Sequence, residues 1–249
     1  KIPIILLNAR ITKKSFKRWN YFPNFSKKIF QKITLAMPQN LETLKFLKIF
    51  GVKNIKLVGN LKYFGENKKK STNKNLRKKF FKKILWCAAS THNKEELFIG
   101  KTHKELKLKI NNLITIIIPR HINRKDEIVS ELSKIGLKTA LHSSSDKIKS
   151  DTDVYLVDTY GEASKFYELT SLTFLGGSLI PHGGQNPLEP ARKGNYILYG
   201  PNIDNFKEVY LMLKNIGSAS KINSIKKMRD AVKNKINYKQ TRKINNKLT

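Results

Sequence analysis

The sequence predicts an α/β fold in which a parallel β-sheet is covered by helices on both faces. Short apolar runs alternate along the chain with amphipathic runs, which is the order found when helices join the strands of a sheet. In addition, the polar motifs follow the apolar runs directly, at the carboxyl ends of the predicted strands. Open parallel sheets bind ligands at that edge, so both observations favour the same architecture.

The elements follow from the type of each run. Continuous apolar runs are typical of buried strands, and strands are expected at residues 4–7, 35–37, 55–58, 84–88, 114–118, 138–140, 154–157, 172–175 and 195–198. Amphipathic runs predict helices near residues 16–19, 39–50, 94–112, 124–135, 162–169, 187–193 and 206–216. From Ser218 onward the chain is rich in Lys and Asn, so we expect a marginal helix or a frayed tail.

A break in this alternation divides the chain. Residues 63–79 are polar and charged and lack an apolar period, as expected of a linker. We therefore predict part of one domain at 1–62, a linker at 63–79, and a second domain at 80–249 that ends in a basic tail. Because Lys1 already precedes a strand-like run, we expect the chain to be a fragment of a longer protein.

The composition limits the classes of function. The 249 residues carry a formal net charge of +32, but most of the basic residues are Lys, and Ile and Asn are also abundant, as in proteins from AT-rich genomes. We find no Arg-rich patch with interleaved aromatic residues, so no nucleic-acid partner is expected. The basic clusters at 68–70, 77–79 and 82–83 predict either contact with an anionic membrane surface or a solvated linker and helix face.

The single cysteine and the lack of long apolar runs give further limits. Cys87 is the only cysteine, so an intrachain disulfide is excluded and a reducing compartment is expected. No run approaches the roughly 20 apolar residues that cross a bilayer, and no signal peptide opens the chain.

The most informative motif is a pair of glycine-rich turns. Residues 174–178 (Phe-Leu-Gly-Gly-Ser) lead from an apolar strand into residues 182–190 (His-Gly-Gly-Gln-Asn-Pro-Leu-Glu-Pro). Glycines let a backbone approach an anion, and a helix start offers unpaired N–H groups to a phosphate. A carboxylate at Glu189 suits a ribose diol. The alternative is a tight strand-to-helix turn with an ordinary helix cap.

Other strand ends carry polar residues that suit the same ligand. Arg120 stands at the end of an apolar run, where its guanidinium can make bidentate hydrogen bonds to a phosphate or carboxylate. The alternative is that Arg120 caps a helix or pairs with a structural acid. His92 and His121 are either ligand contacts or structural histidines. Residues 158–162 (Asp-Thr-Tyr-Gly-Glu) predict a turn whose backbone reads a nucleobase edge, or else a helix cap. We find no metal-ligand spacing and no nucleophile elbow.

With these residues in view, the chain resembles the 3-deoxy-D-manno-octulosonic acid (Kdo) transferases. These are inverting glycosyltransferases of the GT-B type that attach Kdo from CMP-Kdo to a lipid A precursor in lipopolysaccharide biosynthesis. The matching segments keep the order of the family over about the first 210 residues: 7–10 (Leu-Asn-Ala-Arg), 58–62 (Val-Gly-Asn-Leu-Lys), 88–92 (Ala-Ala-Ser-Thr-His), 119–121 (Pro-Arg-His), 158–162, 174–178 and 183–190.

This resemblance implies a GT-B architecture with two Rossmann-like domains. The first 62 residues would be the tail of the acceptor-side domain, and the domain from residue 80 would bind CMP-Kdo. Lys62 would stabilise charge in the transition state, without a metal or other cofactor. The resemblance places these residues at the CMP site: Pro119, Arg120, Tyr160, Gly161, Glu162, Gly176, Gly177, Ser178, Asn186, Pro187, Leu188 and Glu189.

The resemblance also implies what the chain lacks. The catalytic base of the family is a glutamate in the early N-terminal domain, so this fragment should bind donor weakly and transfer nothing. The full-length enzyme is expected at the cytoplasmic face of the inner membrane. Gln185 stands where the family usually has His, which removes a potential positive charge.

Two other functions remain open at this point. One is a different GT-B nucleotide-sugar transferase or epimerase, because such enzymes share the glycine-rich turn and the ribose carboxylate. The other is a basic nucleic-acid-binding protein, which the charge alone would permit.

Overall fold

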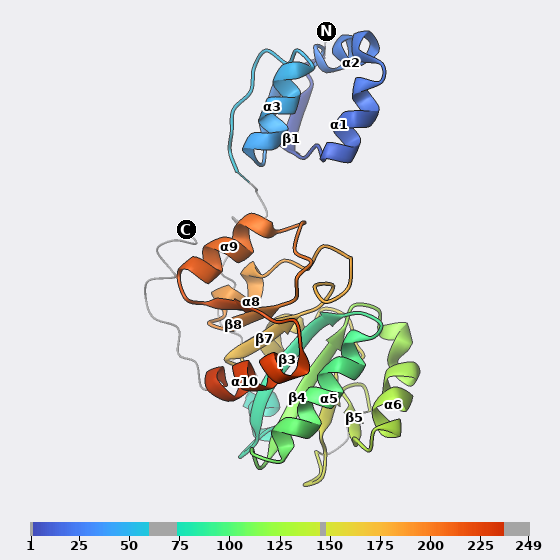
Figure 1. Cartoon of the computed structure of the whole chain (residues 1–249), viewed down its shortest axis with the longest axis vertical. Coiled ribbons are helices and arrows are strands. Elements are labelled where there is room, and N and C mark those ends of the chain that lie inside the picture. Colours follow the sequence, from blue (N-terminus) through green and yellow to red (C-terminus); the bar gives the residue numbers. More distant parts are fainter. Residues whose placement is uncertain (1, 60–73, 145–147, 237–249) are drawn as a thin grey trace. The chain divides into compact units, whose positions relative to one another are not determined.

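The computed structural model describes residues 2–59, 74–144 and 148–236 (Figure 1). The chain divides into two compact units, Lys1–Asn67 and Lys68–Leu248, and each is described by itself. The division falls inside the predicted linker at 63–79. Within the same stretch, Lys74–Lys79 form a short helix, α4, whose Leu76 side chain is buried.

Unit 1 contains a two-stranded parallel sheet and three helices. In chain order these are β1 (Ile5–Ala9), α1 (Lys13–Asn20), α2 (Pro23–Phe30), β2 (Leu35–Pro38) and α3 (Leu41–Ile49). Thr12 and Asn40 begin α1 and α3 by accepting the backbone N–H of Ser15 and Thr43. The strand expected at 55–58 is reduced to a single bridge between Ile55 and Ala36.

Aromatic rings form much of the core of unit 1. Phe30 stacks on Phe50 with ring centroids 4.7 Å apart, and Phe16 stacks on Phe46 at 4.1 Å. Ala36 of β2 and Leu47 of α3 are fully buried beneath them. The sequence did not predict α2, whose short segment begins with a proline at its first turn, a position that a helix tolerates.

Unit 2 is a seven-stranded parallel sheet with helices on both faces. Its elements are α4, β3 (Ile84–Thr91), α5 (Glu95–Lys107), β4 (Leu113–Pro119), α6 (Lys125–Lys134), β5 (Thr139–Leu141), β6 (Val154–Leu156), α7 (Ala163–Tyr167), β7 (Leu172–Leu175), α8 (Leu188–Arg192), β8 (Tyr196–Tyr199), α9 (Lys207–Asn215), β9 (Ala219–Lys221) and α10 (Ile225–Lys235). The strand order is β5-β6-β4-β3-β7-β8-β9. From β3 the chain builds one half of the sheet through β4, and β7 begins the other half on the opposite side of β3. The topological switch point therefore lies between β3 and β7.

The sheet is buried on both faces, which explains the continuous apolar runs. Every residue of β4 is buried. One face carries Trp86 and Phe174 and packs against α5, α6 and α10. Figure 1 shows α5 and α10 side by side over this face. On the opposite face, Phe166 of α7 contacts the ring of Tyr155.

From Ser218 onward the described chain forms a strand and a helix, so of the two predicted alternatives the helix is observed and the frayed tail is not. Residues 219–221 form β9 at the edge of the sheet, and Ile225–Lys235 form α10. Met228 and Val232, one helical turn apart, are fully buried against α5. Two buried residues among many lysines suffice to anchor a helix on a preformed core. Among the described helices, none is long and apolar enough to cross a membrane.

Candidate functional site

The ends of β3, β4 and β7 meet at the switch point of unit 2. The backbone N–H of Arg120, just after β4, donates to the carbonyl of Thr91 at the end of β3 at 2.9 Å. On the other side of β3, the N–H of Gly176 donates to Ala89 O at 2.9 Å. A Cβ atom on Gly176 would lie 2.3 Å from the Ser90 carbonyl, so only glycine permits this approach. The predicted motifs after these three strands are therefore brought together.

A buried carboxylate occupies the first glycine turn. Glu95, the first residue of α5, is 1% exposed and accepts the backbone N–H groups of Gly177 at 2.7 Å, Ser178 at 3.2 Å and Leu179 at 2.9 Å. It also accepts the N–H of His92 at 3.0 Å. Burial raises the pKa of Glu95, while these hydrogen bonds oppose the rise.

The role predicted for the first glycine turn is thereby corrected. The N–H groups of Gly177 and Ser178 donate to Glu95, and that of Gly176 donates within the sheet, so none of the three is offered to a phosphate. The Ser178 hydroxyl donates to Leu175 O and accepts the N–H of Gly200, which ties β7 to the segment after β8. Gly176, Gly177 and Ser178 therefore support the site through hydrogen bonds within unit 2.

The second glycine turn lies next to the first and leads to α8. Gly183 and Gly184 have φ angles of +95° and +75°, and the N–H of Gly184 donates to Gly177 O at 2.8 Å. The Asn186 side chain accepts the N–H of Leu188 at 3.1 Å, which fixes the entry to α8. Pro187 and Leu188 are buried, whereas Glu189 is exposed and available to a ligand. Because α8 has only five residues, the predicted helix dipole contributes little here.

Three histidines gather above the glycine turns. The ring of His92 lies 4.4 Å from that of His182 and 5.9 Å from that of His121, centroid to centroid. Burial lowers the pKa of His92 to about 4, and the nearby His182, His121 and Arg120 act in the same direction. His92 is therefore neutral near pH 7, with Nδ1–H donated to Ser90 O at 3.0 Å. Arg120 is exposed at the same edge, where it can reach an anionic ligand.

The turn after β6 is held by its own contacts. Asp158 accepts the N–H and hydroxyl of Ser143 at 2.9 and 2.5 Å, which supports the structural alternative for this aspartate. Tyr160 is 72% exposed, and Gly161 adopts φ +80°. The Glu162 carboxylate pairs with Lys165 at 2.7 Å, so its side chain already has a cationic partner.

The remaining predictions about the site have different outcomes. Pro119 is the buried last residue of β4 and precedes Arg120. Lys62 lies outside the described residues. Within the described part of the chain, no cluster of three or more His, Cys, Asp or Glu side chains could hold a metal ion. Sequence reasoning missed Glu95 and His182. The only available signal for Glu95 was a pair of glutamates at a helix start.

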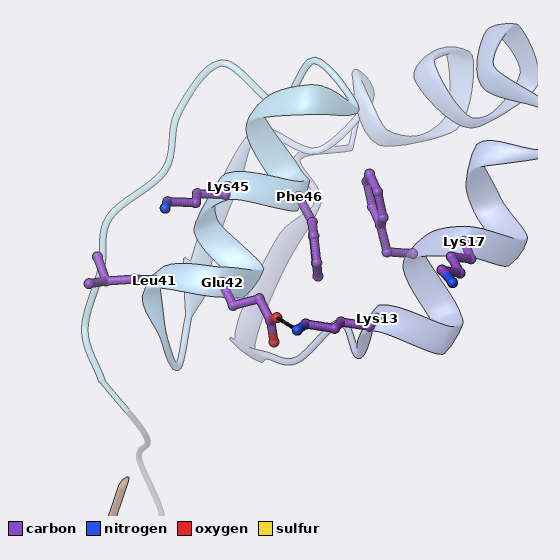
Figure 2. Close-up of a pocket in the computed structure, with 7 residues that line it drawn as sticks. Lys13, Lys17, Leu41, Glu42, Lys45 and Phe46 are labelled. Carbon is purple, nitrogen blue, oxygen red and sulfur yellow. Dashed lines mark ion pairs between the residues drawn. The ribbon is translucent and has the colours of Figure 1, made fainter. Parts of the chain in front are cut away.

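Unit 1 has a separate, open pocket of about 490 Å³ between α1 and α3 (Figure 2). The stacked rings of Phe16 and Phe46 form its apolar floor, together with Leu41. Lys13, Lys17 and Lys45 also line the pocket, and Glu42 approaches Lys13 at 3.9 Å. This pocket therefore combines an apolar surface with an excess of positive charge.

The sheet order and the glycine turns at its switch point define an α/β fold of the GT-B glycosyltransferase type. A Staphylococcus aureus MnaA–UDP structure covers 93% of this chain with a TM-score of 0.50 at 16% identity, and this chain covers 60% of it. At that identity the likeness shows the fold alone.

Closer comparisons single out one family within that fold. Residues 1–64 match the family model described as 3-deoxy-D-manno-octulosonic-acid transferase (kdotransferase). A Haemophilus influenzae 3-deoxy-D-manno-octulosonic acid transferase is 29% identical over 97% of this chain. The C-terminal CMP-Kdo binding domain of WaaA from Acinetobacter baumannii is 29% identical, with a TM-score of 0.60, over 63% of this chain and 83% of that domain. The predicted resemblance to the Kdo transferases is confirmed, and this chain spans 58% of the length of the Haemophilus relative.

Proposed function

We propose that this chain is the C-terminal part of a Kdo transferase, an inverting enzyme that transfers Kdo from CMP-Kdo to a lipid A precursor. The observation that carries the proposal is the edge of unit 2 where Arg120, His182 and Glu189 accompany two glycine turns, in a unit similar to a CMP-Kdo binding domain. In this proposal the linker region joins an acceptor-side unit to the donor unit.

The proposed chemistry assigns a role to each group of residues. The acceptor hydroxyl attacks the anomeric carbon of Kdo, its proton passes to the family's base outside this chain, and CMP leaves. The Arg120 guanidinium and Lys62 would offset the charge that develops on the single phosphate. Glu189 would accept the ribose hydroxyls. The exposed turn at Tyr160, Gly161 and Glu162 would contact the base, mainly through its backbone because Lys165 pairs with the Glu162 carboxylate.

Calorimetry with CMP, UDP and GDP tests the donor assignment. We expect CMP to bind most tightly, and the variants Arg120→Ala and Glu189→Ala each to weaken CMP binding about tenfold, equivalent to about 1.4 kcal/mol. Arg77→Ala and Asp151→Ala are matched controls, because these side chains are exposed on α4 and before β6. A preference for UDP, or unchanged CMP affinity in both site variants, would instead support another GT-B transferase or epimerase.

We also propose that unit 1 faces an anionic lipid surface, at the cytoplasmic face of the inner membrane in the full-length enzyme. The support is the pocket of Figure 2, whose lining includes three lysines and two phenylalanine rings, because a phosphorylated and acylated acceptor is both anionic and apolar. Each Lys near an anionic leaflet contributes about 1 kcal/mol.

Vesicle sedimentation tests this second assignment. Binding of the chain to vesicles with anionic lipid should fall when Lys13, Lys17 and Lys45 are all replaced by Gln. Replacing Lys78, Lys82 and Lys83 of unit 2 is the matched control, since the first two are exposed and Lys83 is half-buried. If only the unit 2 variant loses binding, the membrane surface lies on the clusters near α4 instead.

A further inference from the structure

We propose that Glu95 is a positioning residue of the donor site, whose carboxylate acts as a built-in anion that holds the glycine turn 176–179 in place. The inference rests on the proposed function, because it concerns the site assigned there to CMP. Its physical basis is separate, since it depends only on contacts within unit 2.

The first argument is the saturation of this carboxylate by backbone donors. Each oxygen of Glu95 accepts two N–H groups: Oε2 those of His92 and Gly177, and Oε1 those of Ser178 and Leu179. Among the ion pairs of the described residues, none joins Glu95 to a Lys or Arg. The charge is therefore balanced by backbone dipoles, including the start of the 13-residue helix α5.

The second argument is the geometry of the donors. Three successive N–H groups, at residues 177, 178 and 179, converge on one carboxylate in a turn that contains Gly177 at φ +65°. Such converging N–H groups form a concave anion site, which in many proteins takes a phosphate. Here a side chain of the same protein fills it.

The third argument is the link from this turn to the residues proposed to touch CMP. The carbonyl of Gly177 accepts the N–H of Gly184, which lies in the second glycine turn. A Cβ atom at Gly177 would lie 3.2 Å from both His182 Nδ1 and His92 Cε1, so the turn also sets the position of these rings. Displacing the first turn would therefore displace the path to Asn186 and Glu189.

The neighbouring residue Glu96 provides a matched comparison. It is also fully buried in the first turn of α5, but its carboxylate pairs with Arg124 at 3.1 Å, and no hydrogen bond or ion pair among the described residues joins it to the glycine turns. Removal of the Glu96 carboxylate should lower the free energy of unfolding without altering the glycine turn 176–179.

Chemical rescue tests the proposal. In Glu95→Ala the N–H groups lose their acceptor, and we expect CMP affinity to fall about tenfold or more at a temperature where circular dichroism shows the variant folded. Sodium formate, compared with sodium chloride at equal ionic strength, should restore CMP affinity and raise the melting temperature of this variant. Wild type and Glu96→Gln should not respond to formate.

A second variant keeps the test possible if Glu95→Ala does not fold. Glu95→Gln keeps the size of the side chain but turns an N–H₂ group toward backbone N–H donors, so amide resonances of residues 177–179 should shift and CMP binding should weaken. Unchanged CMP affinity in both folded variants would overturn the proposal. So would a loss of affinity in folded Glu95→Ala that formate leaves unaltered.

These outcomes are separable from failure of the proposed function. If wild type binds no CMP but formate still stabilises Glu95→Ala, the built-in anion is supported and the donor assignment fails. If CMP binds to wild type and neither variant changes it, the donor assignment stands and the role of Glu95 fails.

Discussion

At the scale of single residues, the buried ionisable groups of unit 2 show which contacts carry stability. Asp153 precedes β6 and is 2% exposed. Burial alone would raise the pKa of Asp153. Hydrogen bonds from His103, Lys107 and the backbone N–H of Lys138 outweigh burial and hold this pKa well below its usual range. The aspartate thus joins α5, β5 and β6 at the edge opposite the candidate site.

Replacing Asp153 should destabilise unit 2 in a pH-dependent manner. We expect Asp153→Asn to lower the free energy of unfolding by about 3 kcal/mol near neutral pH, because a charged partner is removed from a buried cluster. A depressed carboxyl pKa contributes stability above the unfolded pKa of about 3.9 and loses it as pH falls. Urea titrations should therefore show the difference from wild type shrinking below about pH 4. Asp151→Asn, at an exposed carboxylate, is the control, and an equal effect there would contradict the argument.

His92 should give a second pH dependence of the same sign, from a base that burial keeps neutral. Its pKa of about 4 is lower than the ordinary value near 6.5, so the unfolded chain binds a proton more readily. Stability should then fall as pH falls between these two values, and His92→Gln should remove that part of the pH dependence. The groups that face His92 are His182, His121, Arg120 and Glu95. An NMR titration of His92 with a midpoint above about 6 would contradict this account.

At the scale of elements, apolar pattern predicted strands better than helices. The strand at 172–175 was predicted with its observed bounds, because Leu172–Leu175 are apolar or β-branched and buried on both faces. The helix α2 was missed, and α10 was predicted only as a marginal helix or a frayed tail, because the buried positions of both are few and separated by lysines. Tertiary packing, which a local pattern does not contain, decides such helices.

The close approach of β3 and β7 should be intolerant of a single methyl group. In Gly176→Ala, Cβ would meet the backbone of Ser90 at 2.3 Å and Thr91 at 2.6 Å, so we expect a loss of about 2 kcal/mol or more in unfolding free energy. Gly136→Ala is the control, since its Cβ meets nothing within 4 Å and only the φ of +78° is strained. Fluorescence of Trp86 in a Trp19→Phe background reports unit 2. Equal losses in both variants would show that strain and not contact dominates.

The packing of α10 can be tested by cavity formation. Met228→Ala should lower the free energy of unfolding by about 2–5 kcal/mol, because this side chain is fully buried against α5. Lys226→Ala, at an exposed position of the same helix, should change it little. If guanidinium titrations show an equally small change in the free energy of unfolding for both substitutions, the tight packing of α10 is contradicted and a frayed tail is favoured.

At the scale of the whole molecule, the strand-end rule predicted that the polar motifs meet at one edge of the sheet, but only the structure revealed the contacts among them. The motifs at Arg120 and Gly176–Ser178 were expected at one edge of the sheet, and the structure brings them there. The contact between Glu95 and Gly177 spans 82 residues of sequence, and no local pattern encodes such a distance. The roles assigned to individual residues toward CMP remain predictions.

The two units should respond differently to the nucleotide. Under the proposed function, hydrogen exchange of the full chain should slow on addition of CMP at the strand ends of unit 2, including residues 182–189. Exchange in α1, α2 and α3 should be unchanged, and addition of GDP should have a weaker effect. Protection confined to unit 1 would contradict the assignment of the donor to unit 2.

The packing of α10 against α5 also has a consequence for the order of events during translation. α5 follows the first strand of unit 2, and the helix that covers it is the last described element of the chain. While the ribosome is still adding residues, the face of α5 that packs against α10 stays uncovered. The nascent unit is therefore exposed to aggregation or chaperone capture until its final helix emerges.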